Sequence, residues 1–139
     1  MATQNFKNHT KWVPLYHFVL FLLMLAGLIL AIINLIKGIS LLSVLLLILA
    51  ISVVLGSFFT RIFALRAQDR AIRAEESLRY FSMTGKLLNP SLTIHQIIAL
   101  RFASNDEFVE LTAKALQSNM SAKEIKQAIQ HWRADLYRV

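Results

Sequence analysis

Four histidines are the side chains of this sequence best suited to bind a metal ion or to transfer a proton: His9, His17, His95 and His131. A metal site on a helix needs two ligands three or four residues apart, because only that spacing puts both on one face. No two of these histidines are so spaced. We therefore predict no metal site and no haem ligation. His9 and His17 precede or open a long apolar stretch, and an amphipathic ring suits the edge of a membrane.

Other catalytic chemistry is also poorly supported. Glu75 and Glu76 are adjacent carboxylates, but neighbouring residues on a helix point in different directions, so they do not form an acid–base pair. The sequence has no cysteine, which excludes disulfides, thiolate metal sites and a cysteine nucleophile. It also lacks a phosphate-binding glycine loop and the G-x-S-x-G and H-E-x-x-H motifs. We expect no catalytic residue and no cofactor, and we predict that the chain is not an enzyme.

The elements that carry these residues are unusually apolar. The chain has 139 residues, of which 56% are hydrophobic and 17% charged, whereas soluble domains have about 45–50% and about 25%. The excess lies in residues 15–36 and 38–60, which contain no Asp, Glu, Lys or Arg. Each block is long enough to cross a hydrocarbon core of about 30 Å. We predict two membrane spans. If the hairpin were buried in a soluble protein, the remaining residues could not cover its apolar surface. A cleaved signal peptide would have a shorter apolar run than residues 15–36.

Basic residues predict the orientation of the two spans. Lys7 and Lys11 precede the first span, and only Lys37 lies between the spans. Five arginines follow the second span: Arg61, Arg66, Arg70, Arg73 and Arg79. The positive-inside rule then puts both termini in the cytoplasm. Membrane-interface positions are predicted at Trp12, Tyr16, His17, Arg61 and Arg66. Apart from His17, the spans hold no ionisable residue, so we do not expect a transporter that works alone.

Small residues recur four apart on both spans, Gly27 with Ala31 and Ser52 with Gly56. This spacing lets helix backbones approach closely in lipid. The packing could lie within the hairpin, or it could join the chain to a second protein or to another copy in a homo-oligomer.

Residues 61–82 contain neither Gly nor Pro, so we expect them to continue the second span as one helix, which Gly85 ends. One narrow, alanine-rich face is predicted at Phe63, Ala67, Ala71, Ala74, Leu78 and Phe81. Asp69 with Arg73, and Glu75 with Arg79, have the spacing of helical ion pairs. Two interpretations stay open: a solvated helix held by anionic lipid heads, or a docking helix for a partner.

The remaining residues predict three short helices with capping boxes at Thr93 and Ser121 and a start near Ser104. Their apolar faces are Ile94, Ile97, Ile98 and Phe102; Phe108, Leu111 and Ala115; and Ile125, Ala128, Ile129, Trp132 and Leu136. The last two helices also resemble a helix-turn-helix with Asn119 in the turn. Its second helix would carry Lys123, Lys126 and Arg133, so membrane-tethered nucleic-acid binding is an alternative, although most positive charge lies beside the membrane.

We therefore predict an all-α membrane protein, with a transmembrane helical hairpin, a long juxtamembrane helix and a small C-terminal three-helix cytoplasmic bundle. The expected divisions are an N-terminal cytoplasmic segment (1–14), the hairpin (15–60), a juxtamembrane amphipathic helix (61–84) and a cytoplasmic tail (85–139).

Three segments extend this prediction by resemblance. NFKNHTKWVPLYHF, RIFALRAQDRAIRAEESLRYF and LTIHQIIALRFASNDEFVELTAKAL followed by IKQAIQHWRADLYRV resemble a family of small bacterial membrane proteins known as a domain of unknown function. The resemblance covers nearly the whole chain. It implies a two-span anchor with a cytoplasmic helical tail and brings no established activity, cofactor or catalytic residue. We hypothesise a non-enzymatic accessory or scaffold subunit of the bacterial inner membrane, with the lipid bilayer and a membrane-protein partner or further copies as its contacts and no small-molecule substrate.

Overall fold

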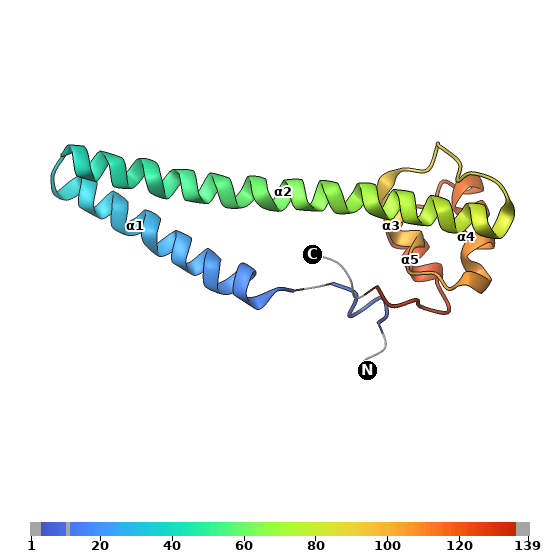
Figure 1. The fold of residues 1–139 in the computed structure, drawn as a ribbon. Coiled ribbons are helices and arrows are strands. Elements are labelled where there is room, and N and C mark those ends of the chain that lie inside the picture. Colours follow the sequence, from blue (N-terminus) through green and yellow to red (C-terminus); the bar gives the residue numbers. More distant parts are fainter. Residues whose placement is uncertain (1–3, 11, 136–139) are drawn as a thin grey trace. The chain divides into compact units, whose positions relative to one another are not determined.

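The computed structural model describes residues 4–10 and 12–135, and within them it is helical without a named strand. A short π-helix, η1 (Leu15–Leu20), leads into α1 (Phe21–Lys37), and a turn connects α1 to α2 (Leu41–Thr84). Three shorter helices follow: α3 (Ile94–Leu100), α4 (Asn105–Gln117) and α5 (Ala122–Ala128) (Figure 1). The prediction of an all-helical chain is confirmed. Two of its helical stretches, Leu15–Lys37 and Leu41–Thr84, are long and apolar enough to cross a membrane.

The chain forms two compact units. Residues 11–64 make the hairpin unit, with η1, α1 and the first part of α2. The described residues 4–10 and 65–135 belong to the tail unit, which therefore combines a segment before the hairpin with the chain after it.

In the hairpin unit, two serines build the turn. Ser43 is 1% exposed, and its Oγ donates to the Gly38 carbonyl at 3.1 Å. The Ser40 backbone N–H donates to Ser43 Oγ at 2.8 Å, and the Ser43 N–H donates to Ser40 Oγ at 3.1 Å. This reciprocal pair satisfies N–H groups that have no partner inside the first turn of α2.

From this turn α1 and α2 diverge (Figure 1). Ala31 is buried, but most apolar side chains of the hairpin unit are exposed, with Ile39 at 87% and Leu41 at 79%. The divergence leaves an apolar groove of about 550 Å³ between the helices. Its lining includes Gly27 and Ala31 from α1 and Leu49, Ala50 and Val53 from α2.

The tail unit has a conventional core. Its fully buried centre comprises Phe102, Phe108, Ala99, Ala103, Ala115 and Ile125, each at 0% exposure. Around them α3 packs mainly against α5 and also against α4. Ile72 of α2 contributes to the same core, so α2 supplies apolar area that a unit of this size needs.

Sequence capping signals set the boundaries of these helices. Thr93 Oγ1 accepts from the Gln96 N–H, and Ser121 Oγ accepts from the Glu124 N–H, each at 3.3 Å. Gly85 ends the α2 turn with φ +70°, and Asn119 has φ +46° in the turn between α4 and α5. Both adopt the left-handed conformation that suits glycine and asparagine. These expected caps and turns are confirmed.

The predicted third tail helix is wrong beyond Ala128, where α5 ends. The Glu107 carboxylate instead accepts the backbone N–H groups of Gln130 and His131, both at 3.0 Å. The chain then runs beside residues 102–104: Ser104 N–H donates to the His131 carbonyl and Arg133 N–H to the Phe102 carbonyl. These tertiary hydrogen bonds replace the helical ones, so Trp132 reaches the core from an extended segment. Leu136 lies outside the described residues.

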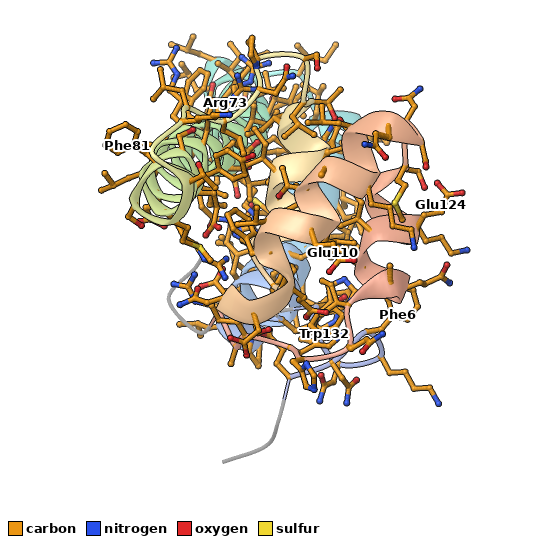
Figure 2. The ribbon with its side chains drawn as sticks, turned by 90° about the vertical axis from the view of Figure 1, so that its right-hand side faces the viewer. Phe6, Arg73, Phe81, Glu110, Glu124 and Trp132 are labelled. Atoms are coloured by element: carbon orange, nitrogen blue, oxygen red, sulfur yellow. The ribbon has the colours of Figure 1, made fainter. Side chains whose placement is uncertain are left out.

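Residues before the hairpin also belong to the tail unit. The His9 ring lies 5.9 Å from the Phe102 ring and 5.8 Å from the Trp132 ring, centroid to centroid. Its Nε2 is 3.1 Å from Lys126 Nζ. Gln4 Oε1 accepts from the Asp135 N–H at 2.8 Å. The N-terminal segment thus packs beside the last described residues, where Figure 2 shows Phe6 near Trp132.

Candidate docking surface

The part of α2 within the tail unit has two different faces. One face packs against the tail helices through Ile72 and Glu76, each 5% exposed, and through Arg79 and Tyr80. These residues recur at helical spacing, as a buried stripe does. Because this stripe contains Glu76 and Arg79, the spacing of apolar residues in the sequence does not reveal it.

Arg79 joins this buried face to the start of α4. Its Nε donates to Asn105 Oδ1 at 2.9 Å, one terminal nitrogen donates to the Ala103 carbonyl at 2.8 Å, and the other pairs with Glu76 at 2.9 Å. Its guanidinium carbon also lies 4.0 Å from the centroid of the Phe108 ring. Arginine suits this place because its planar fork presents several fixed donors and stacks on aromatic rings.

The same contacts correct one predicted ion pair. Arg79 pairs with Glu76, three residues away, and not with Glu75 as the i to i+4 spacing indicated. Among the described residues, Glu75 has no ion pair, and Asp69 and Arg73 do not pair with each other. Arg79 pairs with Glu76 and not with Glu75 because Glu76 lies on the face of α2 that packs against the tail, where Arg79 reaches it.

The opposite face of α2 is the alanine-rich face predicted from the sequence. Within the tail unit it comprises Ala67, Ala71, Ala74, Leu78 and Phe81, and all five are exposed. Leu78 leaves 69% of its surface exposed and Phe81 48%. Figure 2 shows Phe81 projecting from α2 on the side away from Glu110 and Trp132. We call these five residues the outer face. Phe63, in the hairpin unit, is 60% exposed and stacks on Phe59 with 6.0 Å between ring centroids.

Opposite charges border the outer face. On one side Arg66, Arg70 and Arg73 follow each other at helical spacing, and all are exposed. On the other side Glu75 lies beside a broad groove of about 1040 Å³, which Leu78 and the exposed Asp106 of α4 also line. The outer face is therefore a narrow apolar stripe with a basic flank on one side and Glu75 on the other, where Arg79 and Arg133 also line the groove.

The small residues of the hairpin unit do not act as one packing motif. Ala31 is 6% exposed, but Ser52 is exposed and donates from Oγ to its own helix at the Ile48 carbonyl, 2.8 Å away. Side-chain atoms added at Gly27 or Gly56 would begin in open space, with no neighbour within 4 Å of Cβ. These two glycines therefore do not serve a close approach of backbones inside the hairpin.

The predicted membrane-interface residues of the hairpin unit gather around η1. The Tyr16 hydroxyl donates to the Ser57 carbonyl at 3.4 Å, and the Arg61 guanidinium carbon lies 5.6 Å from the Tyr16 ring centroid. The Trp12 and His17 rings are 5.1 Å apart. Arg66 belongs to the basic flank in the tail unit, and Lys11 lies outside the described residues.

The basic residues of the helix-turn-helix hypothesis do not share a surface. Lys123 is exposed on α5, whereas Lys126 approaches His9 and lies 5.7 Å from the Phe102 ring centroid. Arg133 follows α5 and approaches Glu76 at 3.7 Å. A helix of seven residues with one exposed basic side chain in this set offers little for a DNA groove.

The described part of the chain holds no cluster of three or more potential metal-ligating side chains. A small cavity of about 120 Å³ lies beside α2, lined by Glu76, Arg101 and Asp135 among others. Arg101 and Asp135 pair at 3.0 Å across it, so its charges serve the packing of the last described segment.

The sequence did not predict the long-range contacts that hold the tail unit together through Glu107, Arg79 and His9. Each acts on a segment far along the chain, and pairings at that range leave no periodic signal. The capping position of Glu107, three residues after Ser104, was the nearest available sign.

No curated protein and no solved structure is matched by the chain. A protein-family model does match it, over residues 1–139, and that family is described as one of unknown function. The match agrees with the sequence resemblance in pointing to a family of unknown function, and it adds no activity. The chain belongs to this family, DUF6526.

Proposed function

We propose that the chain is a non-enzymatic accessory or scaffold subunit of the bacterial inner membrane, where the hairpin crosses the bilayer and the outer face of α2 binds a helical protein. One observation carries the binding role. The tail covers the face of α2 that carries Ile72, Glu76 and Arg79, and it leaves the apolar outer face exposed.

Exposure of the hairpin supports a membrane anchor. Leu22, Leu30 and Leu49 leave 61%, 65% and 61% of their surfaces exposed. Soluble monomers rarely expose contiguous apolar area of this kind, whereas lipid tails would cover it and would also fill the groove between α1 and α2. The bacterial assignment rests on the resemblance of the AQDRAIRAEE and QIIALRFAS segments.

Two independent observations support termini on the same side of the membrane. Seven basic residues flank the spans outside the turn, and Lys37 alone lies in it. In addition, His9 packs on Phe102 and Trp132 within the tail unit. A segment before the first span can reach the tail after the second only if both lie in one compartment.

The anchor can be tested with single cysteines, because the chain has none of its own. In spheroplasts, Gly38→Cys should react with a membrane-impermeant maleimide, and Lys123→Cys should react only after lysis. The protein should also stay in the pellet after alkaline carbonate extraction. Labelling of Lys123→Cys in intact spheroplasts, or release into the supernatant, would contradict the anchor or its orientation.

The binding role needs a second experiment. A photo-crosslinking amino acid at Ala71, on the outer face, should give an adduct of one defined mass in native membranes. The matched control is Gln117, which is exposed on α4. Peptide mapping should locate the crosslink on a helix of the captured protein. Equal adducts from both positions, or none from Ala71, would remove the outer face as a binding surface.

A further inference from the structure

We infer that the helix bound by the outer face is α2 of a second copy of this chain, and that the two copies pack in parallel. This inference rests on the proposed function, since it names the partner of the same surface. Three features support it: the spacing of the face, the charges beside it and the direction in which the helix runs.

The outer face has coiled-coil spacing. Steps of four, three, four and three residues separate Ala67, Ala71, Ala74, Leu78 and Phe81, and Ala64 stands three residues before the first of them. Alternation of three and four is the a/d pattern by which two helices pack side by side. Alanine at four of these six positions lets the helix axes approach closely, as small residues do at tight helix pairs.

The flanking charges are self-complementary. With Ala71 and Leu78 at a positions, Arg70 takes a g position and Glu75 the following e position. In a parallel pair, g of one helix faces the next e of its partner, five residues along. Arg70 of each copy then meets Glu75 of the other, so two ion pairs form across the two-fold axis.

Other arrangements are disfavoured by the same charges. An antiparallel pair would bring the two arginine flanks, Arg66, Arg70 and Arg73, toward each other. Copies anchored through the same hairpin also leave the membrane in the same direction, which makes the parallel arrangement the natural one. Glu75 is available because Arg79 pairs with Glu76 on the buried face instead.

Little ordering is needed for this association. The tail already holds α2 as a helix through Ile72 and Arg79, so a second copy meets a preformed surface. A preorganised surface loses less conformational entropy on binding. Confinement to one membrane further raises the effective concentration of the copies.

The test is a cysteine scan in native membranes. Mild oxidation should produce disulfide-linked dimers from Ala67→Cys, Ala71→Cys, Ala74→Cys and Leu78→Cys. Arg73→Cys should not give them: it is exposed on the same helix but lies at an outer c position. A parallel two-fold pair brings identical a or d positions together, so this periodic result is specific to it. Dimers that form equally from Arg73→Cys would overturn the inference.

A charge exchange tests the pairing itself. In a background with Ala71→Cys, Arg70→Glu should reduce dimer formation roughly tenfold, because two exposed pairs become repulsive. Glu75→Arg should do the same, and the double variant should restore the dimer. Arg73→Glu, which changes the net charge equally, should have little effect. Failure of the double variant to recover would overturn the Arg70–Glu75 pairing.

The two proposals fail in different ways. If oxidation yields no dimer while the photo-crosslinker at Ala71 captures a different protein, the self-pairing is overturned and the binding role stands. If neither experiment gives an adduct, both proposals fall.

Discussion

Leucine side chains are exposed in the hairpin unit and buried in the tail unit. In the hairpin unit Leu22 and Leu49 each leave 61% of their surface exposed, whereas in the tail unit Leu92 and Leu100 leave 2% and 1%. The polar groups differ as well: the tail unit contains the Arg79–Glu76 ion pair and the Glu107 carboxylate that accepts backbone N–H groups, and the hairpin unit mainly bonds serines to its own backbone. Burial of apolar side chains therefore stabilises the tail, whereas the hairpin leaves its apolar side chains to be covered by lipid under the proposed function.

The largest effect expected from this contrast is loss of a tail core residue. Phe108→Ala should lower the free energy of unfolding of the tail by about 3–5 kcal/mol, because it removes a fully buried ring and leaves a cavity. Denaturant titration in mild detergent, followed by Trp132 fluorescence in a Trp12→Phe background, measures it. Leu49→Ala, with its leucine exposed in the hairpin, should not shift the tail transition. Equal shifts from the two variants would break the comparison.

The next largest effect concerns the buried ion pair. Arg79→Ala should cost about 3 kcal/mol of tail stability, since it leaves the Glu76 carboxylate buried without its closest partner. The same titration applies. Arg73→Ala removes an equally long, exposed arginine from the same helix, and it should change stability by no more than about 0.5 kcal/mol. If Arg79→Ala and Arg73→Ala lowered the stability by similar amounts, the hydrogen bonds and ion pair of Arg79 would contribute nothing beyond its positive charge.

A smaller loss is expected where Glu107 binds the segment after α5. Glu107→Gln should cost about 2 kcal/mol, because one oxygen that accepts a backbone N–H is replaced by an NH₂ group. Amide hydrogen exchange at Gln130 and His131 should accelerate together with that loss. Glu110→Gln, on the exposed side of α4, provides the control and should leave both amides protected. Unchanged exchange in Glu107→Gln would contradict the assigned role.

The smallest effect lies at the start of α5. Hydrogen bonds from the Ser121 side chain, and then from its backbone N–H, lower the pKa of Glu124 below its ordinary value of 4.5. Because the folded-state pKa is lowered, this stabilisation is present above pH 4.5 and is lost as the pH falls through the lowered value. Ser121→Ala should raise the titration midpoint of Glu124 measured by NMR. Ser91→Ala should leave it in place, and an unmoved midpoint in Ser121→Ala would show that the Ser121 hydroxyl does not lower the pKa of Glu124.

Local signals predicted much of this architecture. Apolar length predicted the two long helices, and capping residues such as Thr93 and Ser121 predicted where short ones begin. The end of α5 was not predictable in the same way, because Ile125, Ala128, Ile129 and Trp132 keep helical spacing while Glu107 takes over the backbone N–H groups of the segment.

The outer face shows the same limit of sequence-based prediction. Periodicity located the alanine-rich face, but it could not tell which side of α2 the tail would cover. The covered side carries Glu76 and Arg79. Their charges predict exposure from the sequence, and only their pairing with each other and with the tail explains why they are covered. The hairpin glycines illustrate the converse: Gly27 has the spacing for close packing, yet its surroundings are open.

The contact of His9 with Phe102 and Trp132 also bears on the order of synthesis. The segment around His9 leaves the ribosome more than a hundred positions before Trp132, and the two meet in one core. Under the proposed topology, a chain that inserted only one span would leave these two segments in different compartments, and its core would stay unfinished. The contact of the His9 segment with the tail core would then form only in chains in which both spans had entered the membrane.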